Sequence, residues 1–360
     1  MLPRERLLTA CRRGQPDRVP YIFSVTPPMQ ETFERETGAT DIAEYFAFDC
    51  RSVGVGPTRK QTDFRPYFAD LELPSDTCID EWGVAQTPPA VDDPMTLHFR
   101  HSISPLRHAT TIAEVEAFPL PDLDAGYRFE GMAATVAAYK ARGLAVQGGL
   151  GFSTFDHSWL IRGIDQFMMD MVSNPLMAAA IMDRVLVILR NTVRKYVEAG
   201  VDIVIWGEDV GTERAMMISP RLWRRMIKPR FHSMIQAAKE VNPEVVIWYH
   251  SCGNIEPIIP DLIEIGVEVL NPIQPEAMDP ARLKALYGDR LAFWGGVSVQ
   301  RTMPFGAPTQ VRAEVKERIE TVGRNGGYVI APAHSLEPEV PWQNVLAFVQ
   351  AALDYGRYRD

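Results

Sequence analysis

The stretch VVIWYHSCGN, residues 245–254, combines the pattern of a buried β-strand with two side chains that zinc favours. Its first five residues are apolar or aromatic, and Gly253 with Asn254 suits a tight turn before the helical pattern of residues 255–265. Side chains two positions apart in an extended segment share a face, so His250 and Cys252 could reach one ion. The stretch therefore predicts a strand that delivers an imidazole and a thiol at its carboxyl end.

The His-x-Cys pair alone does not decide between a metal site and ordinary packing. A hydrogen-bonded interior histidine beside a small buried cysteine explains the same residues equally well. The metal spacings that carry strong specificity contain two such pairs, and this stretch has one. The choice therefore depends on what the rest of the chain places nearby.

The stretch belongs to an alternation of strand-like and helix-like segments that continues from Gly143 to the end. Further helical patterns separate strand-like runs at residues 144–150, 201–207, 245–250, 267–272, 291–296 and 327–332. Residues 19–24 and 49–55 add two early strands. Alternation implies parallel pairing, and eight such units fit a closed barrel better than an open doubly wound sheet.

We therefore predict an α/β fold, with residues 1–360 forming a single (β/α)8 TIM barrel. Residues 57–142 interrupt the alternation, since they are rich in Pro, Asp and Thr and contain only short regular pieces. We interpret them as an elaboration within the barrel, between its second and third strands. In this segment, residues 80–83 (DEWG) either cover the mouth of the site or form a turn with one packed tryptophan.

Composition narrows the class of partner. The chain of 360 residues is 46% hydrophobic and 23% charged, with a formal net charge of -9. An acidic surface field does not attract nucleic acid or an anionic membrane, so we expect a small-molecule or protein partner. No apolar run approaches the length of a membrane span. The four cysteines are scattered, which favours a reducing, cytoplasmic location.

The carboxyl ends of barrel strands carry the working residues of this fold. Glu208 and Asp209 follow the fourth predicted strand, His250 and Cys252 the fifth, and His334 the eighth. The fifth and eighth strands lie across the barrel mouth, so His334 completes a predicted three-ligand zinc site with one coordination position open. Strand alternation predicts that one acid faces the mouth and the other braces a loop. The mouth-facing acid is the candidate general acid or base, and a solvated helix-capping pair is the alternative.

The remaining histidines carry less weight. His157 follows the third predicted strand and could touch a substrate. Ordinary surface or packing roles suit the histidines of the 57–142 elaboration and of one helix, namely His98, His101, His108 and His232.

At the strand ends the sequence resembles the uroporphyrinogen decarboxylase superfamily, which includes the zinc methyltransferases that serve corrinoid proteins. The resemblance covers most of the chain and is best at residues 207–209 (GED), 249–253 (YHSCG), 293–296 (FWGG) and 330–334 (IAPAH). This superfamily folds as a (β/α)8 barrel. The resemblance therefore implies the fold that the strand count predicts.

The methyltransferase branch is the closer match. True uroporphyrinogen decarboxylases carry an Arg-Gln-Ala-Gly-Arg-Tyr motif after the first strand, whose arginines hold the substrate's carboxylates, whereas residues 23–28 here read FSVTPP. The methyltransferases bind zinc through His-x-Cys and a later cysteine. His250 and Cys252 match the first two ligands, and His334 stands where the later cysteine is expected.

The resemblance implies a zinc-dependent methyltransferase that moves a methyl group between a separate corrinoid protein and a small thiol or methoxy/methylated substrate. The alternative is a metal-free decarboxylase of a carboxylated small molecule, with Glu208 or Asp209 as proton donor and His334 holding the carboxylate. A non-enzymatic metal-binding barrel is disfavoured, because a scaffold has no need of polar groups that converge at one rim. The substrate, the direction of transfer and the oligomeric state, a homodimer included, stay open.

Overall fold

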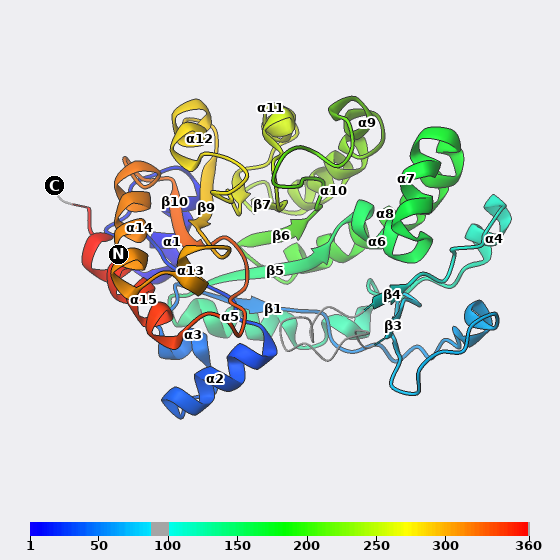
Figure 1. The fold of residues 1–360 in the computed structure, drawn as a ribbon, viewed down its shortest axis with the longest axis horizontal. Coiled ribbons are helices and arrows are strands. Elements are labelled where there is room, and N and C mark those ends of the chain that lie inside the picture. The colour runs from blue at the N-terminus through cyan, green and yellow to red at the C-terminus, as the bar shows by residue number, and fades with distance from the viewer. Residues whose placement is uncertain (88–100, 359–360) are drawn as a thin grey trace.

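The computed structural model describes residues 1–87 and 101–358. Within them, the main sheet is parallel throughout and has the strand order β1-β5-β6-β7-β8-β9-β10. Its strands are Cys50–Val53 (β1), Ala145–Phe152 (β5), Ile203–Gly207 (β6), Val246–His250 (β7), Val269–Asn271 (β8), Ala292–Val297 (β9) and Tyr328–Pro332 (β10). The predicted α/β alternation is confirmed, since helices lie between successive strands (Figure 1).

The helices that follow β5 surround the sheet, and most of them are crossovers, because parallel neighbours cannot be joined by a tight hairpin. They are Thr154–Arg162 (α6), Ile164–Ser173 (α7), Pro175–Glu198 (α8), Pro220–Met226 (α9), Lys228–Val241 (α10), Ile259–Glu264 (α11, after the 3-10 turn Glu256–Ile258), Pro280–Tyr287 (α12), Thr302–Phe305 (α13), Pro308–Thr321 (α14) and Trp342–Tyr355 (α15). Among the described helices, no single one is long and apolar enough to span a membrane. The pair α7 and α8 passes by length and composition only when combined, and it is bent by 119°.

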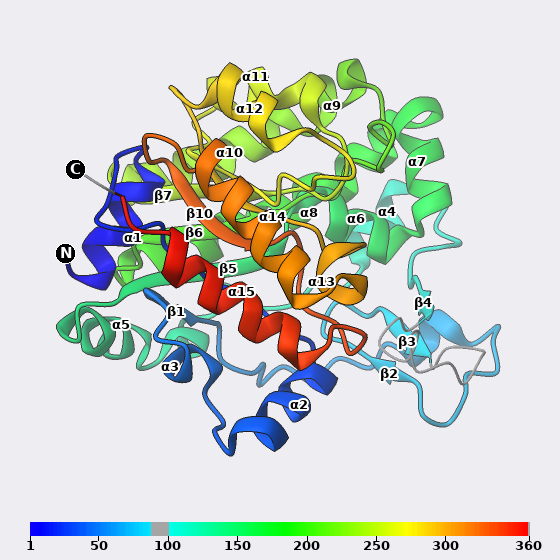
Figure 2. The same cartoon turned by 60° about the vertical axis from the view of Figure 1, so that its left-hand side comes forward.

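Along each strand, side chains alternate between the face that packs on the helices and the face that points to the inside of the curled sheet. On β6, Val204 and Trp206 belong to the large core beneath the helices, whereas Ile203 belongs to a separate inner cluster with Ala145 and Val246. Helix α1 (Pro3–Cys11) inserts Leu7, Leu8 and Cys11 into the inner cluster. The amino ends of the strands are thus closed by α1, which leaves the carboxyl ends for the site (Figure 2).

The predicted first strand, residues 19–24, does not form a regular ladder in the described structure. Tyr21 makes an isolated parallel bridge to Ile330 of β10, and Val25, the residue after this run, makes another to Leu336. Toward β1, side chains replace backbone pairing: the Tyr21 hydroxyl donates to the Phe46 carbonyl at 2.7 Å, and the Phe23 ring packs on Phe48. A curled seven-stranded sheet is therefore what the described residues form, and closure by an eighth strand stays a prediction.

The segment between the first two sheet strands in sequence contains a small antiparallel sheet of its own. Before β1 lie Pro27–Thr37 (α2) and Ile42–Tyr45 (α3). After it come Arg65–Phe68 (η1), Cys78–Ile79 (β2), Ala85–Thr87 (β3), His101–Ile103 (β4), Ile112–Ala117 (α4), Gly126–Phe129 (η2) and Met132–Ala141 (α5). His98 lies outside the described residues.

Candidate active site

Three predicted metal ligands converge at the carboxyl ends of the strands. His250 is the last residue of β7, Cys252 follows two positions later, and His334 lies two residues beyond β10. One donor atom from each lies within 4.8 Å of the others, and the Cys252 Sγ to His250 Nε2 distance is 3.3 Å. The structure therefore brings together all three residues that the strand-end rule selected.

Asn271, the last residue of β8, orients the imidazole of His250. Its side-chain Nδ2 donates to the Trp294 carbonyl at 3.0 Å, which turns its Oδ1 toward His250 Nδ1 at 2.5 Å. Since a carbonyl oxygen only accepts, this network assigns the ring proton to Nδ1 and leaves the Nε2 lone pair facing Cys252. Hydrogen bonds of this kind are what fix a metal-binding histidine. Asn271 was not among the predicted site residues, although its position at the end of a strand was a usable signal.

The donor set suits zinc. Two imidazoles and one thiol are ligands that Zn²⁺ binds in catalytic sites with an open position. Burial, with the Asp209 and Glu213 carboxylates, raises the pKa of Cys252 to about 12, so the thiol is protonated at neutral pH when no cation is near. A divalent cation bound to the sulfur stabilises the thiolate, and this lowers the pKa of Cys252 against the effects of burial and of the two carboxylates. The residues therefore fit a zinc ion whose binding releases the Cys252 proton.

We expect Asn271→Leu to lower zinc affinity by about 10- to 100-fold, because the imidazole loses the acceptor that holds it in place. Competition with a chromogenic chelator measures this change. Asn344→Leu is a matched control, since its amide is also buried and donates to backbone carbonyls, those of Met303 and Gly306. Equal zinc affinities for Asn271→Leu and the wild type would contradict the orienting role.

The two predicted acids occupy opposite sides of the strand. Asp209 faces the site, where its Oδ1 accepts the Cys252 backbone N–H at 2.9 Å and lies 3.5 Å from His250 Nε2. Glu208 is buried on the other side, where its carboxylate accepts hydrogen bonds from the hydroxyls of Ser153 and Thr154. As alternation predicts, one acid lies at the mouth and the other braces the loop after β5. The mouth-facing candidate is Asp209.

Burial raises the pKa of Glu208 from 4.5 to about 7. A carboxyl whose folded-state pKa is raised stabilises the fold fully below pH 4.5, and this stability is lost as the pH rises through 7. We therefore expect the free energy of unfolding of the wild type to fall by about 2 to 3 kcal/mol more between pH 5 and pH 8 than that of Glu208→Gln. Urea unfolding at both pH values measures the difference. If the free energy of unfolding changes with pH to the same extent in the wild type and in Glu208→Gln, the pKa of Glu208 is not raised.

Behind the acids lies a buried layer that does not reach the cavity. Asp156 accepts the Asp209 backbone N–H at 3.3 Å, and burial, with the nearby Asp209 and Glu208 carboxylates, raises the pKa of Asp156 well above its usual value. The His157 ring stacks on Trp82 with centroids 3.9 Å apart, and burial lowers the pKa of His157 to about 3. Residues 80–83 therefore form a turn with a packed tryptophan, Trp82, and do not cover the mouth of the site. Neutral His157 has a packing role.

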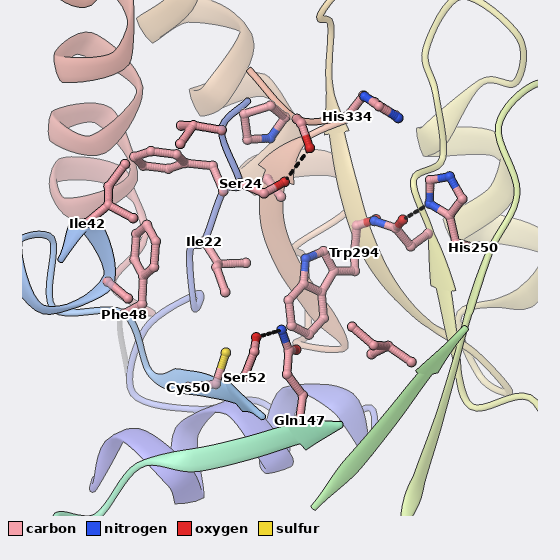
Figure 3. A pocket seen from close by; sticks show the side chains of 18 of the residues that line it. Ile22, Ser24, Ile42, Phe48, Cys50, Ser52, Gln147, His250, Trp294 and His334 are labelled. Carbon is pink, nitrogen blue, oxygen red and sulfur yellow. Dashed lines mark hydrogen bonds between the residues drawn. The ribbon is translucent and has the colours of Figure 1, made fainter. Parts of the chain in front are cut away.

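A cavity of about 690 Å³ runs from His250 and His334 across the inside of the sheet (Figure 3). Its walls are largely apolar and aromatic, and they include Ile22, Phe48, Ile205, Trp248 and Trp294. Ser52 and Gln147 are among its polar residues. Strand register brings these positions together from separate parts of the chain, so the spacing of residues along the sequence does not predict this lining.

The cavity holds no free guanidinium among its described lining residues. Arg51 lines it, but its Nη2 donates to the Glu44 carboxylate at 2.8 Å, and its Nη1 donates to the Phe48 and Cys50 carbonyls at 3.0 and 2.9 Å. A substrate with many carboxylates needs cationic partners in such an interior. The cavity therefore suits a substrate with little negative charge.

Known proteins resemble the chain at the family level. The uroporphyrinogen decarboxylase (URO-D) family model matches residues 95–355. The chain is 30% identical over 159 residues to the methylcobamide:CoM methyltransferase MtaA of Methanosarcina barkeri, covering 44% of this chain and 43% of MtaA. It is 24% identical over 185 residues to the uroporphyrinogen decarboxylase of Pelodictyon phaeoclathratiforme, covering 50% of each chain. The chain thus spans about half the length of the curated relatives it matches.

A solved structure extends the likeness to the whole fold. A methyltransferase from Methanosarcina mazei superposes with a TM-score of 0.65 at 18% identity, covering 99% of both chains. This superposition shows that the two chains share a fold. The family match and the higher identity to MtaA than to the decarboxylase agree with the resemblance seen in the motifs. The chain belongs to the uroporphyrinogen decarboxylase family and fits its MtaA-like methyltransferase branch better than its decarboxylases.

Proposed function

We propose that the protein is a zinc-dependent methyltransferase that moves a methyl group between a separate corrinoid protein and a small thiol or methoxy/methylated compound. In this proposal residues 19–24 complete a (β/α)8 barrel, and the chemistry takes place at its mouth. One observation carries it: donor atoms of His250, Cys252 and His334 lie within 4.8 Å of one another beside a cavity of about 690 Å³.

The side chains around this point have distinct roles. His250, Cys252 and His334 would hold the ion, and zinc bound there supplies a Lewis acid for the sulfur or oxygen that carries the methyl group. Asn271 holds the His250 ring with Nε2 toward the site. Asp209 fixes the Cys252 backbone and places a carboxylate where it can accept the proton of a thiol substrate. The apolar walls exclude water from the reacting atoms.

A corrinoid partner is part of this proposal, since MtaA is named for methylcobamide and the resemblance implies a separate corrinoid protein. The cysteines Cys11, Cys50, Cys78 and Cys252 are free thiols, which supports the proposal that the enzyme works in the cytoplasm. The competing decarboxylase is less well supported. Its carboxylated substrate needs a cation, and the guanidinium of Arg51 is already engaged with Glu44. Burial, with the neighbouring His250, lowers the pKa of His334, so the group expected to hold the carboxylate is a poor cation.

An assay of methyl transfer to cob(I)alamin tests the proposal. A set of methoxy and methylthio compounds serves as methyl donors, and the visible spectrum of methylcobalamin reports the transfer. We expect transfer by the zinc-loaded protein and none after the metal is removed by chelation. Release of carbon dioxide from a carboxylated substrate by the metal-free protein, without methyl transfer, would favour the decarboxylase and contradict the proposal.

A further inference from the structure

The wall of the cavity formed by β1 and β5 carries a polar pair. Ser52 and Gln147 are directly paired in the parallel ladder of these strands, and both line the cavity. Gln147 Nε2 donates to Ser52 Oγ at 2.9 Å (Figure 3). This bond fixes the amide so that Gln147 Oε1 can accept and the Ser52 hydroxyl can donate to a ligand. The pair thus offers one donor and one acceptor side by side.

Aromatic and aliphatic side chains separate this pair from His250. Trp294 lies between Ser52 and His250 in the cavity, and it packs edge to face on Trp248 with centroids 6.0 Å apart (Figure 3). The Trp248 ring is inclined by only 19° to the His250 imidazole. Flat walls of this kind suit a planar, apolar body. The volume of about 690 Å³ leaves room for such a body beyond the methylated atom.

The polar pair, whose Ser52 is exposed to the cavity, offers no counter-charge to an anionic group. Arg51 is the one arginine or lysine among the described lining residues, and its guanidinium is taken up by Glu44 and two backbone carbonyls. Neutral hydroxyl and amide groups replace the hydration of a neutral ligand group well, whereas a buried carboxylate needs a counter-charge. The pair therefore favours a hydroxyl over a carboxylate of the same shape.

We propose that Ser52 and Gln147 form a polar subsite that binds the hydroxyl group of a neutral, ring-sized substrate whose methylated atom lies at the His250 end. The orientation of the substrate rests on the proposed function, but the preference for a neutral hydroxyl does not. Gln147 Oε1 accepts a hydrogen bond from the substrate hydroxyl, and the Ser52 hydroxyl donates one to the oxygen of that group. Trp248 and Trp294 contact the ring.

Isothermal titration of the zinc-loaded protein with three probes of matched shape tests the subsite. The probes are 4-methoxyphenol, anisole and 4-methoxybenzoate, which place a hydroxyl, a hydrogen or a carboxylate opposite the methoxy group. We expect 4-methoxyphenol to bind roughly 3- to 10-fold more tightly than anisole, as one or two neutral hydrogen bonds allow. We expect 4-methoxybenzoate to bind most weakly of the three.

Two variants test whether Ser52 and Gln147 cause the preference for 4-methoxyphenol. Ser52→Ala and Gln147→Leu are each expected to reduce the affinity for 4-methoxyphenol toward that for anisole, while the affinity for anisole is kept. Ser173→Ala and Gln350→Leu are the matched controls, because these side chains are exposed on α7 and α15 and do not line the cavity. They are expected to leave all three affinities unchanged.

The subsite is wrong if 4-methoxyphenol does not bind, if 4-methoxybenzoate binds as tightly, or if the two variants weaken all probes equally. Probe selectivity of the wild type decides the question even if a variant does not fold. Zinc content and methyl transfer to cob(I)alamin, measured on the same proteins, separate the two proposals. Lost selectivity with zinc and transfer intact contradicts the subsite alone, whereas kept selectivity without zinc or transfer contradicts the proposed function alone.

Discussion

Replacing Cys252 with alanine is expected to lower zinc affinity by at least about 100-fold and to abolish methyl transfer while the fold is kept. The variant retains two imidazoles, which hold zinc far less well than a site that includes a thiolate. The fold should survive, because Cys252 lies in the loop after β7 and not in the inner cluster that joins the strands to α1. Metal analysis, turnover and thermal unfolding measure the three parts of this prediction.

Cys78→Ala is the matched control for Cys252→Ala, because Cys78 is an exposed free thiol in β2. It should keep zinc, turnover and melting temperature. If Cys252→Ala unfolds together with its loss of metal, the zinc is structural and the catalytic role is contradicted.

The second large effect concerns the mouth-facing acid. Asp209→Asn is expected to lower turnover by about 10²- to 10⁴-fold, the range typical of a general acid or base. Asparagine keeps an oxygen that can accept the Cys252 backbone N–H, so the loop and the zinc content should change little. Steady-state kinetics with a thiol substrate, together with metal analysis of the same sample, test this expectation.

Glu208→Gln is the comparison for Asp209→Asn, since Glu208 follows the same strand but is buried against Ser153 and Thr154. We expect it to keep most of the turnover. Full activity of Asp209→Asn would mean that the carboxylate is a bystander and that the metal ligands suffice.

Periodic apolar patterns predicted most of the fold from the sequence. Each strand-like run after Gly143 matches a strand of the sheet, and helices lie between these strands where helical patterns separated the runs. These features are local, so a single sequence carries them.

Features that depend on the register between strands could not be predicted from the sequence. Residues 19–24 are as apolar and β-prone as the strands of the described sheet, yet side-chain packing of Tyr21 and Phe23 replaces backbone pairing toward β1. Alternation predicted that Glu208 and Asp209 face opposite sides but not which faces the mouth, because a slip of one residue exchanges the two faces.

The site shows the same division between local and long-range information. Strand ends located His250, Cys252 and His334, whose donor atoms do converge. The partners that complete the site come from neighbouring strands: Asn271 of β8 orients His250, and Gln147 of β5 pairs with Ser52 of β1. Which polar side chains meet across strands follows from the register of the ladder and not from spacing along the chain.

X-ray absorption at the zinc edge of the purified protein, combined with metal analysis, tests the central claim most directly. We predict about one zinc per chain, bound by one sulfur at about 2.3 Å and two imidazole nitrogens at about 2.0 to 2.1 Å, with a lighter atom in the open position. The sulfur contribution should vanish in Cys252→Ala. A wild-type protein that transfers methyl groups without zinc, or a zinc spectrum with no sulfur neighbour, would contradict the account.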